Sequence, residues 1–140
     1  MTRHAKKSLL SLSVIGLLLA AEAAYSFAAA HDIRLLFFYR QHCKWCRMMD
    51  DVLDDPAIRQ ILQENVQTMK IDVYGRERTG TDGATGAELA KKYNVFGVPT
   101  LIFLGARQEE LLRVPGVLTK EDFRDLLCEY VAAGSGFCRK

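Results

Sequence analysis

The chain contains several apolar runs, and the period of each run predicts a strand or a helix. Ile33 to Arg40 is almost continuously apolar, which is typical of a strand buried on both faces of a sheet. Val66 to Val73 and Glu109 to Val114 alternate apolar and polar side chains, a pattern that favours strands with one solvated face. Thr100 to Leu104 is a short apolar run and predicts a fourth strand.

Helical spacing occupies most of the segments between these runs. Apolar residues recur three and four apart from about Cys43 to Leu53, which predicts a helix. Asp55 and Pro56 suit the N-cap and first position of a second helix. Two further helices are expected, over residues 87–93 and after a Thr119 cap, with the glycines at 134 and 136 ending the last one.

The order of these elements predicts an α/β fold in a single domain, residues 31–140. Helical crossovers come early in the chain and a hairpin comes late, so we expect a mixed sheet of about four strands with helices on both faces. The polar stretch from Tyr74 to Gly86 contains four glycines and is expected to be a surface loop.

The first 30 residues have the layout of a secretory signal peptide. Three basic residues precede the uncharged run Leu9 to Ala21, and signals for cleavage after Ala23 or Ala30 follow. The apolar run of 13 residues is shorter than the roughly 20 that span a bilayer as a helix. We therefore expect a periplasmic or secreted protein, with an uncleaved membrane anchor as the alternative.

Composition and charge exclude some function classes. Of the 140 residues, 49% are hydrophobic and 26% are charged, which is typical of a globular protein. Without residues 1–30 the chain has 16 basic and 16 acidic residues, because the leader holds three bases and one acid. A neutral domain gives no electrostatic reason to expect nucleic-acid binding.

Four cysteines, all after residue 30, carry the candidate chemistry. Cys43 and Cys46 are three apart where the first strand gives way to a helix. A helix start favours a thiolate at Cys43, because unpaired backbone N–H groups and the helix dipole point at the sulfur. We expect Cys43 to be the exposed nucleophile and the more shielded Cys46 to be the resolving thiol in disulfide exchange.

Other roles for this pair of cysteines have their own sequence requirements. A c-type haem site needs histidine after the second cysteine, but Arg47 stands there. A four-cysteine zinc site normally has two close pairs, whereas Cys128 and Cys138 are ten apart. A purely structural disulfide stays open, as does a non-enzymatic metal-delivery or binding protein that uses the same two thiols.

The motifs resemble those of the thioredoxin family. Cys43-Lys44-Trp45-Cys46 follows one strand, Val98-Pro99-Thr100 precedes another, and Gly116-Val117 follows the last, so the resemblance covers Ile33 to Val131. It implies a thiol-disulfide oxidoreductase without cofactor or metal, and a cis peptide bond that places Pro99 opposite the cysteines. It also implies substrate contacts by Val98, Gly116 and Val117. Trp45 is expected on the surface beside Cys43 as a further contact for the partner protein, with packing onto its own domain as the alternative.

A narrower resemblance is to exported thioredoxin-like proteins associated with bacterial sulfur oxidation (SoxW-like). It rests on the Cys43 to Cys46 motif, Val52 to Pro56, the glycine-containing loop and Gly97 to Thr100. It implies a reductant of protein disulfides, recharged by a membrane thiol electron-transfer protein. A monomer is the default expectation for the oligomeric state.

The surroundings of the dithiol depart from the family pattern. Phe37 stands where cytosolic thioredoxins have a buried aspartate, and Thr68 lies near the position of its lysine partner. His42 replaces the tryptophan before the first cysteine, and as a cation it would lower the pKa of Cys43, with Lys44 acting in the same direction. The alternative is a solvated His42 without an electrostatic role.

The remaining cysteines, Cys128 and Cys138, lie at the end of the last helix and in the tail. A local disulfide between them would hold the C-terminus in place. Free thiols, or an intermolecular bridge through Cys138, are the alternatives.

Overall fold

A computed structural model describes residues 32–79, 83–133 and 136–138. The contacts divide the chain after Ala30, and all described residues lie in the unit that follows, His31–Lys140. The predicted signal peptide, both cleavage positions, and Gly134, which was expected to help end the last helix, lie outside the described residues. Among the described helices, none has the length and apolar character needed to cross a bilayer.

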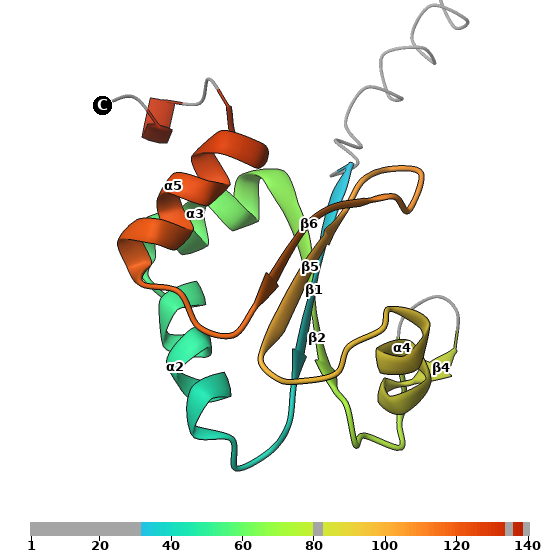
Figure 1. The fold of residues 1–140 in the computed structure, drawn as a ribbon. Helices are drawn as coiled ribbons and strands as arrows, with labels where there is room; N and C mark the ends of the chain where they lie inside the picture. Colours follow the sequence, from blue (N-terminus) through green and yellow to red (C-terminus); the bar gives the residue numbers. More distant parts are fainter. Residues whose placement is uncertain (1–31, 80–82, 134–135, 139–140) are drawn as a thin grey trace, which may run out of the picture. The chain divides into compact units, whose positions relative to one another are not determined.

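The central feature is a mixed sheet of four strands in the order β2-β1-β5-β6 (Figure 1). Strand β1, Ile33–Tyr39, pairs in parallel with β2, Val66–Asp72, and antiparallel with β5, Thr100–Leu104. Strand β6, Glu110–Pro115, pairs antiparallel with β5. This confirms the predicted sheet, although the last strand includes Pro115, which was expected to end it.

Helices cover both faces of the sheet, as predicted (Figure 1). Helices α2, Lys44–Leu53, α3, Pro56–Asn65, and α5, Lys120–Tyr130, lie together on one face. Helix α4, Gly86–Lys92, lies on the other. Helix α5 ends at Tyr130, before the glycines that were expected to end it, and a short 3-10 helix, Gly136–Cys138, follows.

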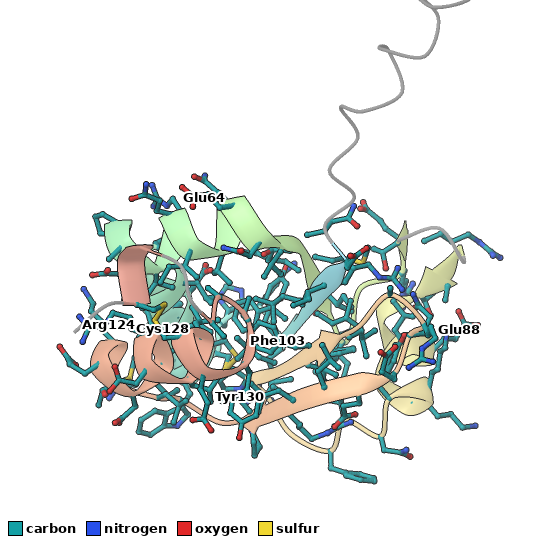
Figure 2. The ribbon with its side chains drawn as sticks, turned by 90° about the horizontal axis from the view of Figure 1, so that it is seen from above. Glu64, Glu88, Phe103, Arg124, Cys128 and Tyr130 are labelled. Atoms are coloured by element: carbon teal, nitrogen blue, oxygen red, sulfur yellow. A yellow bond between two sulfur atoms is a disulfide. The ribbon has the colours of Figure 1, made fainter. Side chains whose placement is uncertain are left out.

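Two apolar clusters form the core, one on each face. Leu35 and Phe37 of β1 belong to the larger cluster with α2, α3 and α5, whereas Leu36 and Phe38 belong to the smaller one with α4. Phe103 of β5, labelled in Figure 2, belongs to the larger cluster, and its ring centroid lies 6.4 Å from that of the tilted Phe123 ring of α5. Burial of β1 on both faces explains its continuous apolar run.

The segment expected to be a plain loop contains a short hairpin. Strands β3, Arg78–Thr79, and β4, Ala84–Thr85, pair antiparallel. Thr85 then caps α4 with a reciprocal pair of hydrogen bonds to Glu88, so the loop leads directly into the helix. Two-residue strands are too short to show alternation, which is why the sequence pattern did not reveal them.

Candidate active site

Cys43 lies at the N-cap of α2, with φ −90° and ψ 114°. Its Sγ accepts a hydrogen bond from the backbone N–H of Cys46 at 3.1 Å, and its carbonyl accepts one from Arg47 N–H at 3.1 Å. A thiolate at this sulfur would be stabilised by the same N–H group and by the positive end of the helix dipole. The local geometry is therefore that of an activated cysteine.

The structure joins Cys43 and Cys46 in a disulfide, with Cα atoms 5.2 Å apart. The expected contrast in exposure between the two is wrong for this disulfide state, because Cys43 is 5% exposed and Cys46 is 4% exposed.

The loop before Cys43 is held in an unusual backbone conformation. His42 has φ +58°, in the left-handed region that L residues seldom adopt. Its exposed side chain lines a hollow of about 250 Å³ together with both cysteines, Arg40 and Arg47, which we call the dithiol hollow. The structure thus brings His42 to the cysteines, and its effect on the thiolate stays a prediction.

Lys44 and Trp45 form a surface pair between the two cysteines. The Lys44 Nζ lies 5.6 Å from the Trp45 ring centroid, a cation–π contact. Trp45 is 57% exposed, so it lies on the surface beside the dithiol and not in the core. A role of Trp45 in contacting the substrate stays a prediction.

An ion pair that the sequence reasoning missed also faces the cysteines. Asp50 of α2 pairs with Lys70 of β2, and both line the dithiol hollow. Lys70 is in register with Phe37, the position where the family pattern has a buried aspartate, and Phe37 itself is 1% exposed in the core. Asp50 follows Cys46 by four residues, a spacing that places both on one helix face and was the available signal.

The predicted Val98–Pro99 motif has a cis peptide bond. The carbonyl of Pro99 accepts a hydrogen bond from Gly116 N–H at 2.8 Å, and Gly116 has φ +88°, which glycine adopts at little cost. Pro99, Gly116 and Phe96 line a hollow of about 300 Å³, which we call the proline hollow. Val98 lines it too, whereas Val117 packs against the larger core cluster.

Cys128 of α5 and Cys138 of the 3-10 helix are also joined by a disulfide. Both pack against the larger core cluster, and Figure 2 shows Cys128 on α5. This bridge is part of the C-terminal structure and lines neither the dithiol hollow nor the proline hollow.

The chemistry available to the site is that of its sulfurs. Among the described residues, no group of three or more His, Cys, Asp or Glu side chains is arranged to hold a metal ion. The site as described contains two sulfurs, a helix start and several charged side chains. These features are suited to thiol-disulfide exchange.

Comparison with known proteins gives the fold a family. A model of the thioredoxin-like domain matches residues 21–131. No curated protein matches the chain significantly.

Several solved structures are similar to the chain. A thioredoxin from Thermus thermophilus is 30% identical, with 84% of this chain and 87% of that chain covered and a TM-score of 0.59. A mutant thioredoxin from Halobacterium salinarum is 29% identical, with 71% of this chain and 74% of that chain covered and a TM-score of 0.52. A DsbH oxidoreductase is 20% identical, with 74% of each chain covered and a TM-score of 0.62, and supports the fold alone.

Fold, dithiol and family agree on the general chemistry. A thioredoxin-like fold that carries the Cys43–Cys46 pair at a helix start supports thiol-disulfide oxidoreductase activity. From the match over residues 21–131, together with the four-stranded sheet, the chain belongs to the thioredoxin-like family.

Proposed function

We propose that the protein is an exported, monomeric thiol-disulfide oxidoreductase that reduces disulfides in other proteins. The observation that carries the proposal is the hydrogen bond from Cys46 N–H to the Cys43 sulfur at the start of α2. The same donor and the helix dipole favour the thiolate, which is the attacking form in exchange.

The reaction proceeds in two exchanges. The Cys43 thiolate attacks one sulfur of the substrate disulfide, so an S–S bond forms at Cys43 and the second substrate sulfur leaves as a thiolate that takes a proton from water. Cys46 then loses its proton and attacks the Cys43 sulfur, which forms the Cys43–Cys46 disulfide and releases the first substrate thiol. The protein dithiol is oxidised by two electrons, and the substrate disulfide is reduced to two thiols.

Export and direction rest on the sequence. The leader pattern over residues 1–30 supports passage out of the cytoplasm, where the second disulfide, Cys128–Cys138, would persist. The SoxW-like resemblance of the Cys43–Cys46 region supports the role of a reductant recharged by a membrane thiol electron-transfer protein. Mass spectrometry of the protein isolated from cells tests the export step, since cleavage after Ala23 or Ala30 gives distinct masses.

Insulin reduction with dithiothreitol tests the function. The wild-type protein should accelerate the reaction, and Cys43→Ser should abolish the acceleration because it removes the sulfur that attacks the substrate disulfide. Metal binding by the two thiols without reductase activity would instead favour a metal-delivery protein.

The potential of the Cys43–Cys46 couple tests the direction. A value near ~−270 mV indicates a reductant and one near ~−120 mV an oxidant. An oxidising value would contradict the proposed direction while leaving the exchange chemistry in place.

A further inference from the structure

An exposed aromatic surface lies at the end of the sheet that carries the dithiol. Strands β1 and β2 end together at Tyr39 and Asp72, and β5 begins beside them with Thr100 opposite Phe38. Residues just beyond these ends therefore gather at one edge. They include Arg40 and Tyr74, which follow β1 and β2, and Phe96, which precedes β5.

Two hollows lie along this edge, and Arg40 lines both of them. One of about 410 Å³ is lined by Arg40, Tyr74 and Phe96, and one of about 480 Å³ by Arg40, Tyr74 and His42. Arg40 also lines the dithiol hollow, so it lies between the cysteines and the two aromatic rings. We call Arg40, Tyr74 and Phe96 the aromatic–arginine surface.

The aromatic rings of Phe96 and Tyr74 on this surface are exposed to solvent. Phe96 is 95% exposed and Tyr74 is 74% exposed. A phenyl ring that contributes almost nothing to its own core can gain from burial against a partner, and aromatic residues are enriched among side chains that dominate binding. The rings flank a concave region of the size that accepts side chains of a ligand.

The charge on this surface is not neutralised from within. Arg40 has no ion-pair or hydrogen-bond partner among the described residues. Asp72, which lines one of these hollows with Arg40, accepts a hydrogen bond from the Tyr74 N–H at 3.0 Å and forms no ion pair with Arg40. Arg40 therefore presents a guanidinium whose fork fits a carboxylate of a partner.

We propose that the aromatic–arginine surface binds a polypeptide segment in which an acidic side chain lies between the target cysteine and an apolar side chain. The acid would meet Arg40, and the apolar side chain would lie between Tyr74 and Phe96, because Arg40 lines the hollows on both sides. The surface thereby selects the partner whose disulfide reaches Cys43. The inference rests on the proposed exchange chemistry at Cys43.

A trapping experiment tests this preference without requiring turnover. The protein with Cys46→Ser forms a mixed disulfide at Cys43 but cannot resolve it. Its reduced form is mixed with peptides whose single cysteine is activated with thionitrobenzoate. Attack by Cys43 forms the protein–peptide disulfide and releases coloured thionitrobenzoate. In each peptide, glutamate or lysine stands next to the cysteine and leucine or serine follows it. Each combination is made twice, once on the N-terminal side and once on the C-terminal side of the cysteine.

The expected result is a charge preference that inverts with Arg40. The glutamate peptide should react about 5-fold faster than the lysine peptide, and Arg40→Glu should reverse the order by a similar factor. Phe96→Ala should slow the leucine peptide by about 5-fold and leave the serine peptide within error. All rates are divided by the rate of the same variant with hydroxyethyl disulfide, which carries neither group.

Matched controls come from the opposite end of the sheet, where Leu104 pairs with Glu110. Arg107→Glu and Leu111→Ala alter an exposed cation and a 42% exposed apolar side chain there, and neither should change the ratios. Equal rates for glutamate and lysine peptides with the wild-type surface would refute the inference. The inference would also be refuted if Phe96→Ala left the peptide rates unchanged and only weakened binding of the protein to anionic lipid vesicles. That result would indicate a surface that faces a membrane.

The two proposals fail in different ways. If insulin is reduced but the peptides show no preference, the exchange chemistry stands and the partner assignment is wrong. If the peptides show the preference but insulin is not reduced, the surface stands and the reductant role is wrong. If no mixed disulfide forms at all, both are refuted.

Discussion

The C-terminal disulfide offers a direct test of how the tail stabilises the fold. Cys128 and Cys138 are 10 residues apart and both pack against the larger core cluster. After α5, the N–H groups of Val131 and Ala132 both bond to the Leu127 carbonyl at 2.9 Å, so the chain turns back toward the helix. We predict that opening this bridge lowers the free energy of unfolding of the whole unit.

The magnitude follows from the loop that the bridge closes. For a separation of 10 residues, the chain-entropy relation gives about 2.7 kcal/mol at 25 °C. For a unit that spans residues 31–140, an entropy of unfolding of about 0.23 kcal/mol/K converts this into a fall in Tm of about 12 °C. The full effect requires the tail to stay in place after reduction, because a tail that detaches gains freedom in the native state as well.

The assay uses protein in which Cys43→Ser and Cys46→Ser leave one disulfide for dithiothreitol to reduce. Urea unfolding is followed by circular dichroism, since the single tryptophan, Trp45, is too exposed to report on the core. The matched control adds Cys128→Ser and Cys138→Ser. Its free energy of unfolding should equal that of the reduced protein and should not change with dithiothreitol. A loss below about 1 kcal/mol would refute the reasoning, because it would mean that the bridge constrains the native tail nearly as much as it constrains the unfolded chain.

Three further predictions concern charge. His42→Gly should raise the pKa of Cys43 while glycine accepts the φ of +58° at that position, and an unchanged thiol titration would remove the electrostatic role of the imidazole. Lys70→Met should raise the pKa of Cys46, measured in protein that also carries Cys43→Ser. The Asp50 carboxylate, which pairs with Lys70, would then be left uncompensated in the hollow that Cys46 lines, and a lowered pKa would contradict this arrangement. A hydrogen bond from the lysine at the start of α5 holds the pKa of Asp55 below its usual range, so the stability it contributes is present above about pH 4 and is lost as the pH falls through the folded-state pKa. Asp55→Asn should therefore lose less stability than wild type between about pH 6 and about pH 3, and equal losses in urea titrations would contradict the assignment.

The sheet was predictable because its strands carry strong local signals. The segment Ile33 to Tyr39 is an almost continuous apolar run, as expected for a strand covered on both faces. The predicted cap at Asp55 and first position at Pro56 match the observed start of α3. The hairpin of β3 and β4 escaped prediction because strands of two residues cannot show a period. The end of α5 was placed too late because the chain already turns at Val131, ahead of the glycines that were expected to end the helix.

In the site, too, features set by neighbouring residues could be predicted, whereas contacts between residues far apart in the sequence could not. Cys43 and Cys46 could be placed at a helix start from their spacing and the preceding strand, since both signals are local. The Asp50–Lys70 pair could not be predicted, because it depends on β2 lying parallel to β1 with Lys70 opposite Phe37. Likewise Arg40 and Phe96 are far apart in the sequence and line one hollow only because β1 ends where β5 begins.

These contacts place the charged side chains that line the dithiol hollow at the surface and not in the core. Phe37, at the position of the family's buried aspartate, is 1% exposed and belongs to the apolar cluster. The side chains of Lys70 and Asp50, by contrast, are 48% and 39% exposed. Charges in water are screened over about 8 Å at physiological ionic strength, whereas buried charges are screened much less. The reactivity of the Cys43–Cys46 pair should therefore depend on salt, because added ions weaken the charged rim and leave the helix-start hydrogen bond in place.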